Sequence, residues 1–171
     1  MTVEWVELGL VIADFDDQSI TDRVAQSDLD GICLSSYDEL GTGESQLRKL
    51  YELNRECARD IPDRGEFYSF DEYVQQRIAV ESFDPRCVVI ATKGDEWIGM
   101  TAASNHLARG FMHDEMTGVV AAYRGRGLSL ALKLANIRRM RSLGTPVIHT
   151  MHNSKNSSAI EMNKRLGYTP R

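Results

Sequence analysis

Two closely spaced glycines separate a predicted strand from the strongest helical pattern in the chain. Residues 112–121 have the character of a strand, and residues 128–143 repeat apolar side chains at three- and four-residue spacing. The segment between them must turn sharply, and glycine permits the positive φ angles that such turns need. A turn of this kind directs several backbone N–H groups and the positive helix end to one point. The sequence therefore predicts an α/β domain in which this segment is either an anion site at the start of the helix or a tight turn with two solvated arginines, Arg124 and Arg126.

The flanking segments predict a mixed, largely antiparallel sheet with helices on both faces. Residues 87–91 and 96–103 are two strands separated by a glycine turn, which is typical of a β-hairpin. A further strand is predicted at 147–150, followed by a last helix that is capped by Ser154 or Asn156. The helices predicted before the hairpin are 44–60 and the one that follows the capping box of Ser69 and Glu72.

Length and composition place these elements in one soluble domain. A chain of 171 residues is enough for one domain and short for two. We expect residues 1–30 to form an N-terminal extension with a candidate edge strand at 3–12, and residues 31–171 to form the domain itself. The apolar runs are too short to span a membrane, and the acidic first 30 residues are unlike a secretory presequence.

The cysteines and charges narrow the expected partners. Cys33, Cys57 and Cys87 lie far apart without a CxxC or Cys/His cluster, so we expect no metal and a reducing, cytoplasmic location. Residues 121–171 contain ten Lys and Arg against one acid, whereas residues 1–120 carry the acidic excess. The basic part could receive a polyanion, and the acidic part a cationic substrate. Alternatively, the two parts complement each other inside the fold.

Two motifs resemble the GNAT superfamily of N-acetyltransferases. Residues 124–129, RGRGLS, are similar to its [Q/R]-x-x-G-x-[G/A] turn, with Ser129 in the last position. Residues 153–156 (NSKN) and 163–168 (NKRLGY) resemble the N-x-x-N…N-x-x-L-G-Y ending of one branch. The likeness covers about residues 44–168. It implies a GNAT-like acyl-CoA N-acyltransferase fold and acetyl-CoA as co-substrate, with no metal.

The resemblance also implies which residues meet acetyl-CoA. In the superfamily the strand before the turn, here residues 116–120, splays from its neighbour, and its free backbone groups bond the pantetheine arm. The turn holds the pyrophosphate. Asn153 and Asn156 match asparagines near the pantetheine, although helix capping explains them equally well. The cofactor-binding residues expected on this basis are Thr117, Gly118, Val119, Arg124, Gly125, Arg126, Gly127, Leu128, Ser129, Asn153 and Asn156.

For catalysis, the resemblance implies a carboxylate on the third strand as general base. Glu115 lies near the position where the family often carries one, and Asp114 is the alternative; strand alternation puts only one of them on the active face. Many members carry a tyrosine, proposed to protonate the leaving thiolate, where this chain has Asn163. An amide cannot act as an acid, but it can hydrogen-bond the sulfur.

The ends and the acceptor leave several hypotheses open. The family normally has one more strand after the Leu-Gly-aromatic motif, so the chain is expected to lack it; residues 3–12 or a partner in a homodimer could fill the edge. The leading function is acetyl transfer to a primary amine of a small, cationic molecule, with a peptide N-terminus or lysine as a second acceptor. The alternative is a catalytically weak acyl-CoA-binding sensor, or one half of a duplicated acetyltransferase. Nucleic-acid binding by the basic part is a further hypothesis, but the sequence contains no nucleic-acid recognition motif.

Overall fold

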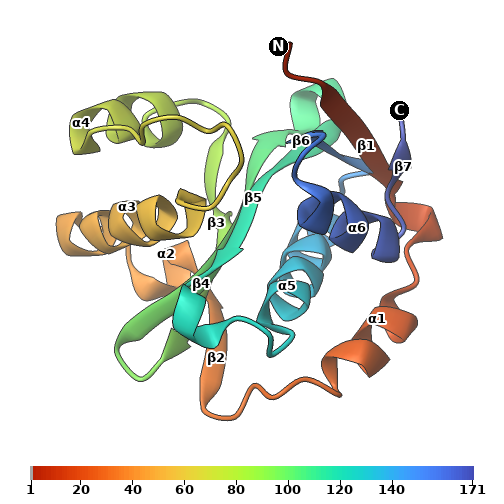
Figure 1. Cartoon of the computed structure of the whole chain (residues 1–171), viewed down its shortest axis with the longest axis horizontal. Coiled ribbons are helices and arrows are strands. Elements are labelled where there is room, and N and C mark those ends of the chain that lie inside the picture. Colours follow the sequence, from red (N-terminus) through yellow and green to blue (C-terminus); the bar gives the residue numbers. More distant parts are fainter. Residues whose placement is uncertain (1) are drawn as a thin grey trace.

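The computed structural model describes residues 2–171, which form a seven-stranded sheet in the order β2-β3-β4-β5-β6-β1-β7 (Figure 1). All neighbouring strands are antiparallel except β5 and β6, which are parallel. The predicted mixed sheet flanked by helices is confirmed. The strands are β1 (Trp5–Val11), β2 (Ile32–Ser36), β3 (Phe83–Lys93), β4 (Glu96–His106), β5 (Phe111–Val119), β6 (Val147–Asn153) and β7 (Thr169–Pro170). The helices are α1 (Asp17–Val24), α2 (Tyr37–Leu40), α3 (Glu44–Ala58), α4 (Phe70–Tyr73), α5 (Leu128–Ser142) and α6 (Ser157–Arg165).

Helices cover both faces of the central strands. α3 packs against β4 and β5, and α5 packs against β3, β4 and β5 from the other side (Figure 1). Alternation along β3 explains its continuous apolar run, because Val88 and Ile90 join the core beneath α3 while Val89 and Ala91 join the core beneath α5. Within residues 2–171 no helix is long and apolar enough to cross a membrane.

Both ends of the chain add to one side of the sheet. β1 lies between β6 and β7 and pairs with β6 from Trp5 to Val11. Its other side pairs with β7 only at Leu8 and Gly9, so the candidate edge strand is covered in part. A strand after Tyr168 was not expected, but the last residues form the two-residue strand β7. Gly167 has a φ of +95°, which turns the chain back along β1, where the Arg171 N–H donates to the Glu7 carbonyl. The division of the chain at residue 30 stays a prediction.

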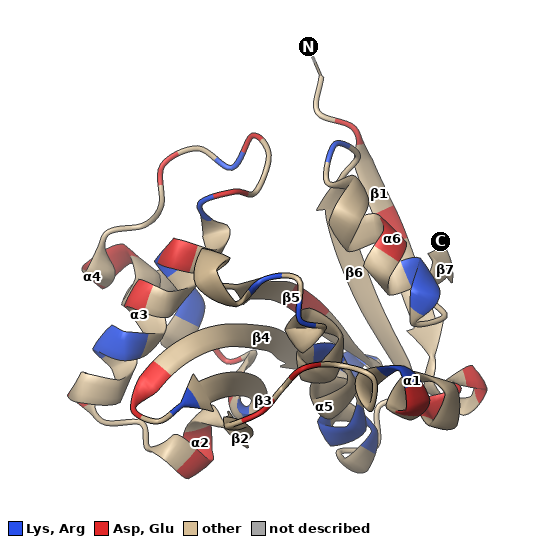
Figure 2. Ribbon diagram, turned by 60° about the horizontal axis from the view of Figure 1, so that its bottom comes forward, with Lys and Arg blue, Asp and Glu red and all other residues tan. Residues whose placement is uncertain are grey.

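The uneven charges meet within the fold. Arg138 and Arg141 of α5 form ion pairs with Asp17 of α1, and Arg139 pairs with Glu39. In Figure 2 the ribbon of α5 has blue segments, and the neighbouring helix α1 has red ones. Since several arginines of the basic part have acidic partners in the other part, complementarity inside the fold explains much of the asymmetry.

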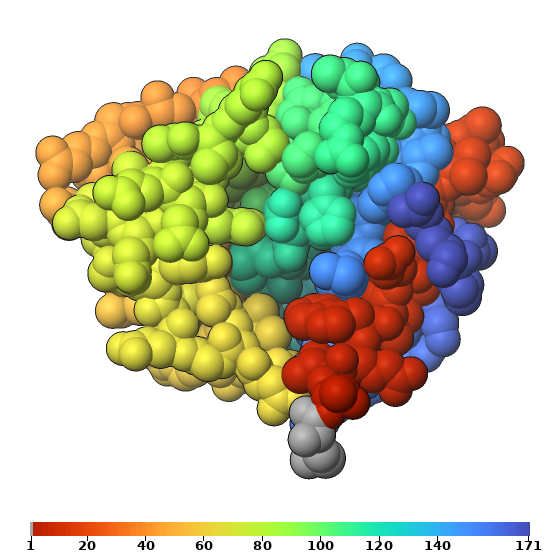
Figure 3. All heavy atoms as spheres, turned by 90° about the horizontal axis from the view of Figure 1, so that it is seen from above, coloured from red at the N-terminus to blue at the C-terminus, as the bar shows by residue number. Residues whose placement is uncertain are grey.

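Strands β5 and β6 separate after a short parallel contact. They pair only at three positions, the last of which joins Asp114 to Thr150. Ala102 and Ala103 of β4 pair with Met116 and Asp114, so Glu115 is the extra residue of a β-bulge. Beyond the bulge, β5 bonds to β4 alone, and β5 and β6 diverge (Figure 2). The space-filling view shows a hollow there, with teal residues of β5 at its floor (Figure 3).

Candidate functional site

The glycine turn opens onto a groove beside the start of α5. Gly125 and Gly127 have φ angles of +78° and +82°, and no side chain caps the helix. Because the first intrahelical bond runs from Ala131 to Gly127, the N–H groups of the first turn have no acceptor within residues 2–171. The groove measures about 650 Å³. Its polar lining includes Arg23, Arg124, Ser129, Ser157, Ser158 and Arg165.

This donor set fits an anion such as a pyrophosphate. Free N–H groups and the positive end of a 15-residue helix face the groove, and three arginines line it. One acidic side chain, Glu161, also lines it. A side chain at Gly125 would extend into open space, whereas a Cβ at Gly127 would lie 2.1 Å from the Ser27 hydroxyl oxygen. Glycine at 127 is therefore also required by the contact with the loop after α1.

The two arginines of the turn have different surroundings. Arg124 Nε donates to the Val119 carbonyl at 2.9 Å, and its Nη1 is 2.7 Å from Asp60 Oδ2 beyond the end of α3. Arg124 therefore ties the end of β5 to α3 while lining the groove. Arg126 is not among the lining residues, and its guanidinium lies over the Tyr123 ring at 5.3 Å from the centroid. Of the two arginines of the turn, Arg124 therefore lines the groove and Arg126 does not.

Residues Thr117 to Val119 lie on the free edge of β5. The Thr117 hydroxyl is 2.7 Å from the Thr101 hydroxyl of β4. A Cβ at Gly118 would lie 2.5 Å from Cys57 Cβ, so glycine at this position permits α3 to pack on the strand. The strand edge away from β4 has no strand partner in the described chain at these positions. Apart from the Val119 carbonyl, which accepts from Arg124, the backbone groups on this edge are therefore available to a ligand lying between β5 and β6.

Asn153 and Asn156 both have local structural partners. Asn156 Oδ1 accepts from the Ala159 N–H at 3.4 Å and so caps α6. Asn153 Oδ1 accepts from the Lys155 N–H, and its Nδ2 is 3.3 Å from Asp63 Oδ2. Asn156 therefore caps α6, which is one of the two roles that the sequence left open. Asn153 fixes the turn before α6.

Asp114 and Asn163 lie in the core rather than beside Glu115. The Asp114 carboxylate is buried in an ion pair with Lys133 of α5, and the Tyr168 hydroxyl lies 3.4 Å from it. Asp114 is therefore engaged with Lys133 inside the core. Asn163 is 2% exposed; its Nδ2 lies 2.6 Å from His152 Nε2, and its Oδ1 has no partner within residues 2–171.

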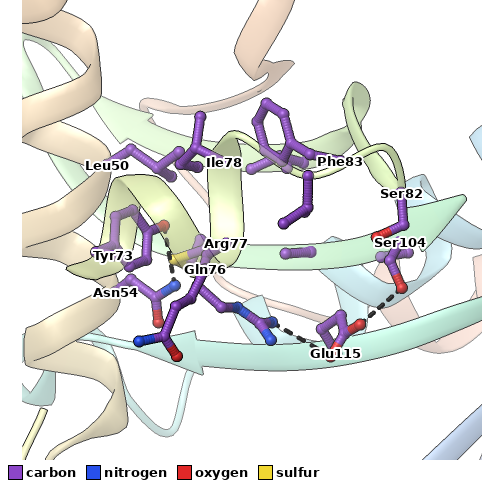
Figure 4. A pocket seen from close by; sticks show the side chains of 15 residues that line it. Leu50, Asn54, Tyr73, Gln76, Arg77, Ile78, Ser82, Phe83, Ser104 and Glu115 are labelled. Carbon is purple, nitrogen blue, oxygen red and sulfur yellow. Dashed lines mark hydrogen bonds and ion pairs between the residues drawn. The ribbon is translucent and has the colours of Figure 1, made fainter. Parts of the chain in front are cut away.

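Glu115 occupies the opposite side of β5, at a small pocket of about 70 Å³ (Figure 4). Its Oε1 accepts from the Ser104 hydroxyl at 2.6 Å, and its Oε2 lies 3.2 Å from Arg77 Nη2. Burial raises the pKa of Glu115, but the Ser104 hydrogen bond and the charges of Arg77 and His113 outweigh it and bring the pKa below the ordinary value. The side chain is therefore an ionised hydrogen-bond acceptor at neutral pH.

Sequence reasoning missed Arg77 and Ser104. The capping box of Ser69 and Glu72 is confirmed, but the regular helix stops at Tyr73, and Val74–Ile78 forms a π-helical turn that carries Arg77 toward Glu115. No periodicity in the sequence distinguishes a π-helical turn from an α-helix. Ser104 lies on β4, opposite β5, and only the observed register brings it to Glu115.

Comparison with known proteins gives one family. A model described as "Acetyltransferase (GNAT) family" matches residues 47–168. A mycothiol acetyltransferase from Nocardiopsis dassonvillei is 28% identical over 123 residues, which are 67% of this chain and 37% of that protein. A GCN5-related N-acetyltransferase from Sphaerobacter thermophilus has a TM-score of 0.70 at 16% identity, covering 98% of this chain and 48% of that one.

A third similar protein is a tandem one. A tandem GNAT protein from the clavulanic acid biosynthesis pathway has a TM-score of 0.69 at 18% identity, over 98% of this chain and 50% of that one. At these identities the two solved structures bear on the fold alone. The chain thus spans about half of each of these two proteins, and 37% of the curated relative.

Proposed function

The chain belongs to the acetyltransferase (GNAT) family, and from this premise we propose that it transfers an acetyl group from acetyl-CoA to a primary amine of a small molecule, by direct attack in a ternary complex. The observation that carries the proposal is the uncapped start of α5 beside the diverging strand that bears Glu115. A small-molecule acceptor agrees with the name of the mycothiol acetyltransferase relative.

We assign the binding of acetyl-CoA to the groove and the free strand edge. The N–H groups of Leu128, Ser129 and Leu130 would hold the pyrophosphate, with Arg23 and Arg165 near enough to the groove to neutralise further phosphate charge. The backbone of Thr117–Val119 would bond the pantetheine arm, as an added strand would. This placement puts the thioester near Glu115, where β5 leaves β6.

Glu115 is the proposed general base. A carboxylate with a lowered pKa is too weak to deprotonate a free ammonium group, whose pKa is about 10. Once the nitrogen has bonded to the carbonyl carbon, however, its remaining protons are far more acidic, and Glu115 accepts one directly or through a water. A backbone N–H of β5 would stabilise the carbonyl oxygen as it becomes negative.

Departure of the thiol requires no strong acid. A thiol has a pKa of roughly 8.5, so the sulfur leaves as a thiolate. Asn163 carries no acidic proton, and its Nδ2 lies against His152. We therefore assign Asn163 at most a hydrogen bond to the sulfur, after a change of its His152 contact.

A second candidate function follows from the lengths of similar proteins. Because the chain spans half of a tandem GNAT protein, it could supply the acyl-CoA-binding half of a two-domain enzyme, without turnover of its own. The two functions differ in one property. An active single domain releases thiol when an amine is added, whereas a binding half binds acetyl-CoA and releases none.

Replacing Ser129 with aspartate tests the cofactor site without damaging the fold. A negative charge in the first turn of α5 stabilises the helix dipole but repels a pyrophosphate held by the same N–H groups. We expect calorimetric titration to show acetyl-CoA binding weakened by about 10- to 100-fold, since like charges at such distances cost about 1 to 4 kcal/mol.

The thermal midpoint and a neutral substitution are the controls for this variant. Ser129→Asn should bind acetyl-CoA nearly as wild type, and Ser129→Asp should melt at or above the wild-type temperature. Substituting Gly127 is less informative, because a side chain there collides with Ser27 and requires a strained φ angle. Unchanged affinity in Ser129→Asp would place the pyrophosphate elsewhere.

A further inference from the structure

Arg77 has free hydrogen-bond donors beside the proposed base, Glu115. The only hydrogen bond of its guanidinium in the described chain runs from Nη2 to Glu115. A guanidinium has five N–H donors in a rigid fork, so most of its donors remain free, and the side chain is 37% exposed. The π-helical turn Val74–Ile78 aims it at the pocket, as Figure 4 shows. π-Helical turns often occur at functional sites.

The pocket around this pair is otherwise uncharged. Arg77 and Glu115 are the only charged residues among those that line it. Asn54, Tyr73 and Gln76 supply neutral polar groups on one side, and Tyr73 already interacts with Asn54 (Figure 4). The inner wall is apolar and consists of Leu50, Ile78, Phe83, Val88, Met100 and Ala102. A ligand therefore meets one positive group, one negative group and an apolar recess.

We propose that the acceptor is an amino acid or a close analogue, whose carboxylate binds Arg77 while its amine faces Glu115. This inference rests on the proposed acetyl transfer. Because Arg77 and Glu115 are in contact, with Arg77 Nη2 3.2 Å from Glu115 Oε2, a small ligand that meets both carries its amine and carboxylate close together, as an α-amino acid does. Arginine suits the carboxylate because its fork makes two parallel hydrogen bonds.

The recess limits the size of the side chain. An apolar cavity of about 150 Å³ holds benzene, whereas this pocket measures about 70 Å³. We expect small aliphatic side chains such as those of alanine and valine to fit, and aromatic ones to be excluded. A polyamine would bring a second positive charge toward Arg77, so the cationic acceptor considered from the acidic composition is disfavoured at this site.

Binding of a carboxylate would also change the proposed base. The charge and hydrogen bond of Arg77 help to hold the pKa of Glu115 low. When a substrate carboxylate engages Arg77, part of this effect is cancelled, and Glu115 becomes a stronger base in the complex than in the free protein. The acceptor carboxylate thereby contributes to catalysis as well as to binding.

Matched pairs of acceptors test the proposal. L-Alanine and ethylamine, and L-valine and isobutylamine, differ only in the carboxylate. We expect wild-type kcat/KM, from thiol release at equal concentrations of unprotonated amine, to be roughly 10- to 100-fold higher for each amino acid. In Arg77→Gln this ratio should fall toward one. Arg77→Lys, which keeps the charge but not the fork, should give an intermediate ratio.

The ratio separates recognition from damage to Glu115. Damage to the acetyl-CoA site or to the position of Glu115 affects both members of a pair and cancels in the ratio, whereas the contact between Arg77 and the acceptor carboxylate, with its effect on Glu115, is made by the amino acid alone. A wild-type preference for the decarboxylated amines, or a ratio unchanged in Arg77→Gln, would overturn the proposal.

A separate measurement applies if no amine releases thiol, the result that would contradict the proposed function. L-Valine would then be titrated calorimetrically into the acetyl-CoA-loaded protein. Valine binding that is lost in Arg77→Gln would still support the recognition site, and absence of valine binding to the wild type would refute it.

Discussion

Replacing Glu115 with glutamine lowers kcat by about 100- to 10,000-fold while acetyl-CoA still binds, the range expected when a general base is removed. Glutamine keeps the size of the side chain, and its amide oxygen can accept from the Ser104 hydroxyl, although the ion pair with Arg77 is lost. What is lost is the group that takes the proton of the attacking amine. Thiol-release kinetics measure kcat, and calorimetry measures acetyl-CoA binding.

A matched control and a pH profile accompany this variant. Glu52→Gln removes a carboxylate from the exposed face of α3, where it pairs with Arg55, and should leave kcat unchanged. Because Ser104 and Arg77 lower the pKa of Glu115, the base is ionised throughout pH 5 to 8 in the free protein. Wild-type kcat/KM should therefore rise with pH as the amine deprotonates, without a glutamate inflection in that range. A kcat within three-fold of wild type in Glu115→Gln, as an approximate limit, would exclude Glu115 as the base.

Replacing Lys133 with methionine destabilises the protein by about 3 to 5 kcal/mol, because it leaves a buried carboxylate without its counter-charge. The side chains of Lys133 and Asp114 are only 5% and 4% exposed. In the variant, Asp114 keeps only the Tyr168 hydroxyl at 3.4 Å as a side-chain partner, and its Oδ1 already lacks one within residues 2–171. Chemical denaturation followed by circular dichroism measures the loss.

The double variant Lys133→Met/Asp114→Asn distinguishes an unpaired charge from lost packing. Removing both charges should recover most of the stability, since a buried ion pair contributes little beyond its own desolvation cost. The coupling between the two sites is read from the double-mutant cycle. If Lys133→Met alone costs less than about 1 kcal/mol, the ion pair does not stabilise the contact between α5 and β5.

Much of the fold could be predicted because its signals are local. The hairpin of β3 and β4 has a glycine turn, and α5 has a long apolar repeat that ends before Gly144. Strand pairings between distant segments have no such signal. The position of β1 between β6 and β7 depends on contacts between the two ends of the chain, which periodicity does not encode.

The candidate site was only partly predictable, because its geometry depends on contacts between segments that are distant in the sequence. Alternation along β5 indicated that only one of Asp114 and Glu115 could face the pocket, but the side that each occupies depends on the bulge and on Lys133. The contact of Arg77 with Glu115 joins a π-helical turn to a strand 38 positions away. Gly118 and Gly127 are expected to meet acetyl-CoA on the basis of the resemblance, and the structure adds a second reason for glycine there, because a Cβ would collide with Cys57 or Ser27.

The most direct test of acetyl transfer is to incubate the purified chain with acetyl-CoA and a panel of amino acids and amines, following free thiol and N-acetylated product together. We predict thiol release that depends on the amine, with an equal amount of N-acetylated product. Binding of acetyl-CoA without amine-dependent release would contradict an active single domain and favour the binding half of a larger enzyme. Failure to bind acetyl-CoA at all would contradict both functions.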